Sequence, residues 1–164
     1  MLHVFRKIYN QIFMKFTPRK INLFLLFKLP AAYLTGIRVA SLEADTVVVR
    51  VRHRWINQNP FKSLFWAVQG MASELTTGVL VMREIANSGK KISMLVTSMN
   101  GKFTKKATGK IRFVSNDGNL IKAAIQKSID TGEGQVVVMT SEGFNAEGIS
   151  VSKFEYEWSV KVKQ

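Results

Sequence analysis

One long helical pattern, with strand patterns on both sides of it, constrains the fold of this 164-residue chain more than any other feature. A helix with an apolar stripe must bury that stripe against another layer of structure, so we expect it to lie against a sheet. The stripe recurs every three or four positions for about seven turns and ends before residues 87–89, Asn-Ser-Gly, at a predicted C-cap. Its members are Phe61, Leu64, Phe65, Val68, Met71, Ala72, Leu75, Val79, Met82 and Ile85.

Alternating apolar segments predict the strands that would form this sheet. Residues 120–129 fit either a strand or a short helix. The predicted strands are 37–42 and 46–55 before the helix, and 92–104, 108–115, 135–141 and 149–162 after it. This order predicts an α+β fold, a curved antiparallel β-sheet wrapped around one long central helix.

The chain is strongly basic, and its positive charge is concentrated at the amino end. It has 24 Lys and Arg against 11 Asp and Glu, a net charge of +13, and residues 1–35 contain no acid. Residues 4–16 predict an amphipathic helix, while 21–34 form a second apolar segment too short and too interrupted to span a bilayer, which needs about 20 apolar residues. We divide the chain into an N-terminal helical extension, 1–35, packed on the domain, and a main domain, 36–164. We expect a cytoplasmic location, with peripheral membrane contact through 1–35.

The scarcity of cysteine and histidine limits the kinds of catalytic and metal site that the chain can form. Because there is no cysteine and only two histidines, disulfide scaffolds, Cys-based zinc sites and cysteine nucleophiles are excluded, and we expect no metal. His53 shares a predicted strand face with apolar residues and is interpreted as a packed histidine. Arg50, Arg52 and Arg54 form a row on the opposite face, which fits a solvated surface or an anion site.

A second face of the long helix carries Glu74 among small residues. Ala67, Gly70, Thr77 and Gly78 recur with it at helical spacing, and small neighbours leave space beside a carboxylate for a ligand or another chain. Asn59 followed by proline has the form of an N-cap at the start of the helix, with Ser63 as a second candidate cap. An exposed helix start offers unpaired N–H groups to a phosphate or a developing oxyanion.

Two segments here resemble the sequence motifs of hotdog-fold thioesterases. In that family an Asn is followed six residues later by His-Gly-Gly, and an acid lies nine residues beyond the His. Asn59, Phe65 and Glu74 stand at these intervals, with Trp66 and Ala67 in place of the two glycines. Residues 103–110, Phe-Thr-Lys-Lys-Ala-Thr-Gly-Lys, are similar to the family's aromatic-x-Arg-Pro-Ala-x-Gly stretch, with lysine in place of proline. The resemblance covers 36–163 in element order and is closest to a branch with an uncharacterised domain and extra N-terminal helices.

The resemblance implies a homodimer or tetramer whose sheets join edge to edge, with a thioester site at the subunit interface. The substrate would be an acyl-CoA or acyl-carrier thioester, with no bound cofactor, and basic residues at the mouth would pair with the phosphates of coenzyme A. The backbone N–H near Ala67 would stabilise the oxyanion, and Glu74 of the neighbouring subunit would act as general base or nucleophile. Asn59 would hold the water or the thioester.

Further substrate contacts are expected from Phe65, Trp66 and Ser63, and from a hydroxyl on the strand after the helix, Thr97 or Ser93. Two other functions fit the same residues. A non-catalytic acyl or lipid binder is suggested by Trp66 and the apolar amino end, and a nucleic-acid or membrane-surface binder by the net charge. No specific nucleic acid is expected, because no nucleic-acid-binding motif is present and the aromatic residues follow core periodicity.

Overall fold

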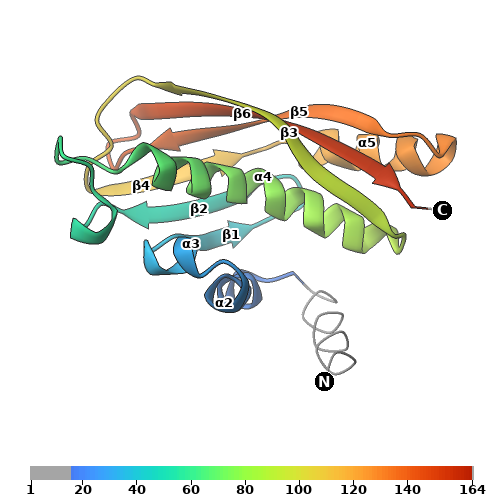
Figure 1. The fold of residues 1–164 in the computed structure, drawn as a ribbon, viewed down its shortest axis with the longest axis horizontal. Coiled ribbons are helices and arrows are strands. Elements are labelled where there is room, and N and C mark those ends of the chain that lie inside the picture. Colours follow the sequence, from blue (N-terminus) through green and yellow to red (C-terminus); the bar gives the residue numbers. More distant parts are fainter. Residues whose placement is uncertain (1–15, 164) are drawn as a thin grey trace.

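A six-stranded antiparallel sheet and one long helix, α4 (Trp66–Ser88), organise the protein (Figure 1). The computed structural model describes residues 16–163. The strand order is β1-β2-β4-β5-β6-β3, which makes β1 and β3 the two edges. The strands are β1 (Arg38–Leu42), β2 (Val47–Arg52), β3 (Ile92–Phe103), β4 (Lys110–Ser115), β5 (Gln135–Phe144) and β6 (Ser150–Val162). The predicted α+β architecture is confirmed.

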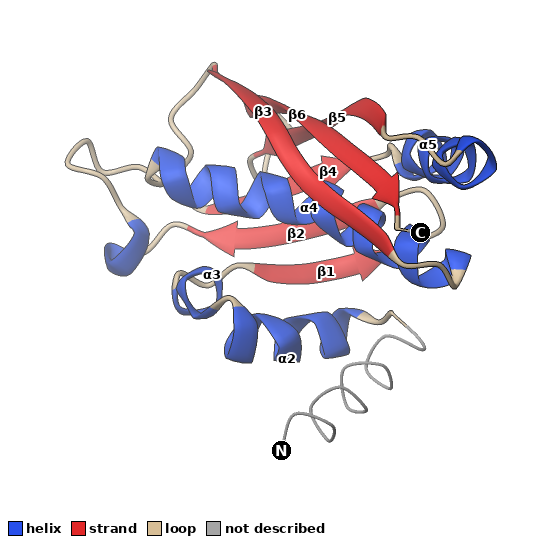
Figure 2. Cartoon of the chain, turned by 45° about the vertical axis from the view of Figure 1, so that its right-hand side comes forward, coloured by secondary structure: helices blue, strands red, loops and turns tan. Residues whose placement is uncertain are grey.

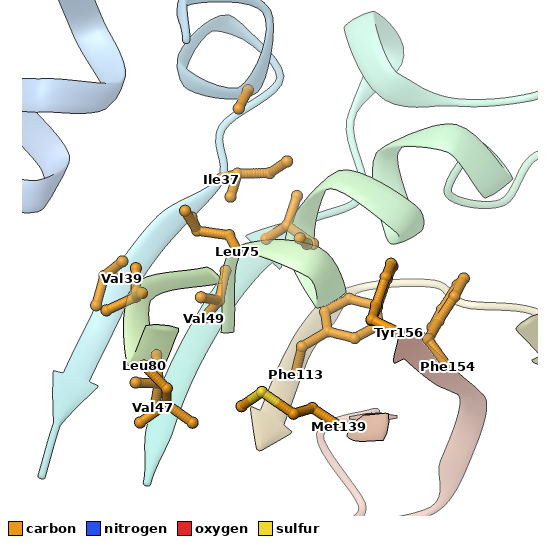
Figure 3. Close-up of a cluster of buried hydrophobic side chains, with 14 of the residues drawn as sticks. Ile37, Val39, Val47, Val49, Leu75, Leu80, Phe113, Met139, Phe154 and Tyr156 are labelled. Carbon is orange, nitrogen blue, oxygen red and sulfur yellow. The ribbon is translucent and has the colours of Figure 1, made fainter. Parts of the chain in front are cut away.

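The core forms where the inward residues of the strands meet the apolar stripe of α4. Alternation along β6 buries Phe154 and Tyr156 and exposes Glu155 between them. Figure 3 shows strand residues such as Val49 and Phe113 converging with Leu75 of the helix. Each such side chain stabilises the fold by about 1.5–3 kcal/mol on burial.

Buried hydrogen bonds also fix how α4 lies along the sheet. They come from three helix positions at four-residue spacing, which therefore share one helix face. Ser152 Oγ donates to Gln69 Oε1 at 2.9 Å, Ser73 Oγ and Tyr156 Oη share a hydrogen bond at 2.6 Å, and Trp158 Nε1 donates to Thr77 Oγ1 at 3.1 Å. Because unpaired buried polar groups are costly, a one-turn slip of the helix would lose all three pairs at once.

Two short helices, α2 (Pro18–Lys28) and α3 (Pro30–Leu34), lie alongside β1, as Figure 2 shows. Proline at position 30 separates them. The amide of Asn22 pairs with the backbone of Val39 in both directions, donating to its carbonyl at 3.0 Å and accepting from its N–H at 2.8 Å. The helices thereby cover one edge of the sheet. Within residues 16–163, no helix is long and apolar enough to cross a membrane.

The long helix begins later than its apolar pattern predicts. The expected N-cap role of Asn59 is wrong, because its Oδ1 accepts instead from the backbone N–H groups of Phe61 at 2.9 Å and Ser63 at 3.2 Å. This folds 59–63 into a turn. Leu64 N–H then donates to the carbonyl of Ala107 at 2.8 Å, which anchors the turn to a distant loop.

Other differences are local. The ambiguous segment 120–129 lies in a helix, α5 (Gly118–Thr131). The second strand ends at Arg52, so Trp55 does not face the core; it starts a short 3-10 helix and is 83% exposed. The amphipathic helix predicted for 4–16 lies outside the described residues.

Candidate functional site

The two sequence motifs meet in one cavity beside the start of α4. Its volume is about 390 Å³. Asn59, Ser63 and Trp66 line it from the first motif, together with Phe61, Leu64 and Gln69, and residues 103–107 line it from the second. The structure therefore brings together segments some 40 positions apart that the sequence analysis linked only by their motifs.

Unpaired backbone donors lie at this helix start. Phe65 is the N-cap, and its apolar side chain cannot accept a hydrogen bond. Its carbonyl accepts from the N–H groups of Val68 and Gln69 at 3.0 and 3.1 Å. The N–H groups of Trp66 and Ala67 have no acceptor among residues 16–163. Together with the positive end of the helix dipole, they can stabilise a negative oxygen.

The side chains of Asn59 and Ser63, from the first motif, form hydrogen bonds within the turn before α4. Besides accepting from two backbone N–H groups, the Asn59 amide donates to Ser63 Oγ at 3.0 Å. Both residues thus shape the wall of the cavity. Phe65 and Trp66 form an edge-to-face aromatic pair with ring centroids 5.5 Å apart. Only Trp66 of this pair lines the cavity, and more than half of its surface is exposed.

Glu74 lies in a second, apolar cavity of about 240 Å³, two helical turns further along α4. Met71 and Leu75 line it from the same helix, and residues 28–32, the junction between α2 and α3, close it from above. The side chain is partly buried. Burial raises the pKa of the Glu74 carboxyl from its ordinary 4.5 to about 7, because the charged form loses water.

The position of the Glu74 carboxylate depends on the space beside Gly78 and not on polar partners. A Cβ atom on Gly78 would stand 2.9 Å from Glu74 Oε1, so only glycine one turn later leaves room for the carboxylate there. No hydrogen bond or ion pair to the carboxylate is found in the part of the chain that the structure describes. A carboxylate with free lone pairs and a pKa near neutrality is suited to general base catalysis.

The two cavities are separate, and the unpaired N–H groups lie at one while the Glu74 carboxylate lies at the other. Ala67 and Glu74 are seven residues apart on one helix, which separates them by about 10 Å along the axis. Thr97 lines neither cavity: it is exposed on β3, and its Oγ1 donates to Glu157 Oε1 at 2.5 Å. The structure therefore does not place Thr97 with the other predicted site residues of its own chain.

Sequence reasoning missed the residues that enclose Glu74. They belong to the junction between α2 and α3. In the sequence this junction is visible only through Pro30, which interrupts an apolar segment. Gln69 was also missed, although it lines the first cavity; its Nε2 donates to the carbonyl of Leu64 at 3.1 Å. Its position on the buried helix face could have been read from spacing, but its hydrogen-bond partners could not.

Comparison with models of known protein families shows which family the chain belongs to. The model of a family described as a domain of unknown function, DUF4442, matches residues 18–160. The chain belongs to the DUF4442 family. No curated protein sequence matches it significantly.

Solved structures show the fold of this DUF4442 protein. A Pseudomonas aeruginosa protein described as of unknown function and a probable thioesterase is 19% identical; the match covers 90% of this chain and 97% of that one, with a TM-score of 0.76. A protein of unknown function from Chlorobaculum tepidum is 17% identical over 90% and 98%, with a TM-score of 0.75. A thioesterase from Haemophilus influenzae is 13% identical over 90% and 92%, with a TM-score of 0.68. The DUF4442 domain therefore has the hotdog fold, as its motifs indicated.

Proposed function

We propose that this DUF4442 protein hydrolyses a thioester of an acyl-CoA or an acyl carrier. The observation that carries the proposal is the Glu74 carboxylate: unpaired, raised in pKa to about 7, and set beside an apolar cavity. Solved structures with the same fold include proteins described as thioesterases, which supports the reaction class. The active site would need two copies of the chain.

The need for two copies follows from distance. A thioester carbonyl must lie about 3 Å from its oxyanion donor, and the attacking water must lie within hydrogen-bond reach of the base. The N–H of Ala67 and the carboxylate of Glu74 in one chain are too far apart along α4 to serve one carbonyl. An antiparallel pair of copies would bring the helix start of one near Glu74 of the other.

The free sheet edge offers the surface for such pairing. Strand β3 is an edge strand of 12 residues, and neither α2 nor α3 covers it. It exposes Leu95 and Met99, with 64% of the Leu95 surface accessible. A long edge with exposed apolar side chains favours pairing with another strand. A two-fold dimer through β3 would extend the sheet into the partner, in agreement with the edge-to-edge assembly that the resemblance implies.

In the proposed reaction, water is the nucleophile. The Glu74 carboxylate accepts a proton from water as its oxygen adds to the thioester carbon, and the N–H of Ala67 on the other copy donates to the developing oxyanion. The carbonyl then re-forms, the C–S bond breaks, and the protonated Glu74 returns its proton to the leaving thiolate. The products are a carboxylic acid and a thiol, and the carboxylate is regenerated.

Substrate binding would divide between the two cavities. The aliphatic lining around Glu74, which includes Leu29, Met71 and Leu75, suits the acyl chain. Lys105 and Lys106 at the helix-start cavity suit the phosphates of coenzyme A or of a carrier's prosthetic arm. This division predicts that chain length changes KM through contacts with the cavity beside the α2–α3 junction.

A thiol-release assay across acyl chain lengths tests the proposal. Glu74→Gln keeps the shape of the side chain and removes the base; Glu147→Gln, on an exposed loop, is the matched control. We expect Glu74→Gln to lower kcat about 100-fold or more, since a general base contributes roughly 10²–10⁴. The control should keep the parental rate. Equal rates in the two variants would exclude Glu74 as the base.

A non-catalytic acyl binder is the second candidate, and the bulky Phe65 and Trp66 at the helix start favour it. That function predicts a fatty ligand that co-purifies with the protein and no turnover at any chain length. Contact of residues 1–35 with a membrane surface, a cytoplasmic location and the absence of a specific nucleic-acid partner remain predictions. Exposed Leu23, Phe27 and Leu34 on the described part of that extension favour the membrane contact.

A further inference from the structure

A basic groove lies on the face of the sheet opposite α4. Its volume is about 540 Å³, and it is lined across β1, β2 and β4 and by the β5–β6 loop. We call it the arginine groove, after its six cationic residues: Arg38, Arg50, Arg52, Arg54, Lys110 and Arg112. No acid lines it. Five of them lie on the strands, where they alternate with the buried residues that face α4, so the sheet itself separates the groove from Glu74.

The cations stand directly opposite one another across the strands. The register pairs Arg38 with Arg50 and Arg50 with Arg112, so three guanidinium groups form one row over three strands. A second row pairs Arg52 with Lys110. Like charges at directly opposed positions destabilise a sheet, so random surface charge does not account for this arrangement.

Nothing described in the protein neutralises the groove. Across residues 16–163 the one ion pair is between Arg83 and Glu84, and it belongs to α4. Glu147 follows the groove residue Ala146 in the loop, but it neither lines the groove nor forms an ion pair with it. The positive field is therefore available to a bound anion.

Two of the guanidinium groups are already held in position. Arg38 Nη1 donates to the carbonyls of Tyr33 and Ile37 at 2.8 and 2.7 Å, and the guanidinium lies 3.5 Å from the centre of the Tyr33 ring. Arg112 lies over the Phe144 ring at 5.0 Å. Side chains held in this way lose less conformational freedom when they bind, and the remaining N–H groups of each guanidinium can bind phosphate oxygens in pairs.

We propose that the arginine groove binds a small ligand with two or more phosphate groups, at a site separate from the thioester site. The volume suits a nucleotide-sized molecule. The two rows lie about 6.6 Å apart along the strands and neighbouring strands about 4.8 Å apart, so more than one phosphate can be contacted at once.

The geometry favours a small ligand over a nucleic-acid strand. Single-stranded nucleic acid binds where bases stack on free aromatic rings beside a basic track. No aromatic side chain of residues 16–163 lines this groove, and guanidinium groups cover the neighbouring rings of Tyr33 and Phe144. The phosphates can come from a soluble diphosphate or from a lipid headgroup that carries two phosphates, and the experiment distinguishes these sources.

Titration calorimetry on the full chain, in about 0.1 M salt, tests the proposal. The soluble probes are inorganic pyrophosphate and ADP, with inorganic phosphate and adenosine for comparison. Arg50→Gln/Arg112→Gln removes the centre and one end of the first row. Lys122→Gln/Lys127→Gln removes the same charge from the exposed face of α5 and is the matched control. We expect pyrophosphate and ADP to bind, and the groove variant to bind them about tenfold or more weakly than the parent, as expected when hydrogen bonds to charged groups are lost.

Flotation with cardiolipin vesicles, against phosphatidylcholine vesicles, tests the lipid source. Binding to cardiolipin that the groove variant loses and the control keeps assigns the phosphates to a lipid; soluble binding with the same pattern assigns them to a free ligand. The proposal is overturned if neither the soluble diphosphates nor the cardiolipin vesicles bind, if both charge variants weaken binding equally, or if oligothymidylates titrated in the same way bind in their place and do so more tightly with length. Glu74→Gln should bind the probes normally, so this result and that of the thiol-release assay are independent.

Discussion

Replacing Glu74 with glutamine should make the protein more stable at alkaline pH, because the folded state keeps an unpaired carboxylate away from water. The pKa of this carboxyl is about 7 in the folded protein and 4.5 as its ordinary value. The folded state therefore binds the proton more tightly than the unfolded chain does. The stability that the protonated form contributes is fully present below about pH 4.5 and is lost as the pH rises through about 7.

The magnitude follows from the two pKa values. Relative to strongly acidic pH, the raised pKa of Glu74 reduces the free energy of unfolding by about 3 kcal/mol at pH 8, where the buried carboxyl is ionised, and by about 1 kcal/mol at pH 5, where it takes up a proton on folding. Glutamine stays neutral and resembles the protonated acid in size. For a domain of this length, Glu74→Gln should raise Tm by roughly 6–12 °C at pH 8 and by roughly 2–4 °C at pH 5.

Thermal unfolding of both proteins between pH 5 and pH 8, followed by circular dichroism, measures this difference. Glu147→Gln, on the exposed loop, should unfold with the parent at every pH. If Glu74→Gln and the parent have the same Tm at pH 8, the carboxylate is well solvated. The apolar cavity beside it would then not perturb its chemistry, and the argument for a general base would fail.

Three further predictions concern how the site is built. Gly78→Ala should displace the Glu74 carboxylate, which lies one turn before it, and so lower the thiol-release rate. Gly70→Ala has open space around its Cβ and should raise the free energy of unfolding by about 1 kcal/mol through helix propensity. Equal stability and equal rates in the two variants would contradict the packing of Glu74 against Gly78. Tyr156→Phe removes a hydroxyl that bonds to Ser73 and should cost about 1–2 kcal/mol in urea unfolding, and an unchanged midpoint would show that this bond does not hold α4. Leu95→Asp places a charge on the free edge of β3 and should give a monomer by light scattering with little thiol release; a fully active monomer would exclude the two-copy site.

The elements whose partners are implied by their own periodicity could be predicted from the sequence. Strand β6 alternates from Ser152 to its end. The apolar stripe of α4 keeps its helical spacing to the last turn, and the glycine at position 89 adopts the left-handed conformation typical of a C-cap. Each pattern arises because one face of the element is buried, so it can be recognised without knowing the partner. The position of Glu74 on the small-residue face of α4 follows from spacing in the same way.

The start of α4 could not be predicted, because it depends on a distant segment. The side chain of Asn59 can cap a helix or a turn, and the turn is favoured here by the hydrogen bond between Leu64 N–H and the carbonyl of Ala107. The environment of Glu74 was hidden for a similar reason. Its shifted pKa depends on the α2–α3 junction lying over α4, and no local pattern encodes that docking.

The pH dependence of kcat/KM for thiol release tests the central claim most directly, since it reports the pKa of the essential base in the free enzyme. With Glu74 as the base, kcat/KM of the parent protein should rise with pH and level off above about 7, and Glu74→Gln should show neither the rise nor more than about 1% of the rate. A glutamine variant that retains the parental rate and the same pH profile would contradict the account.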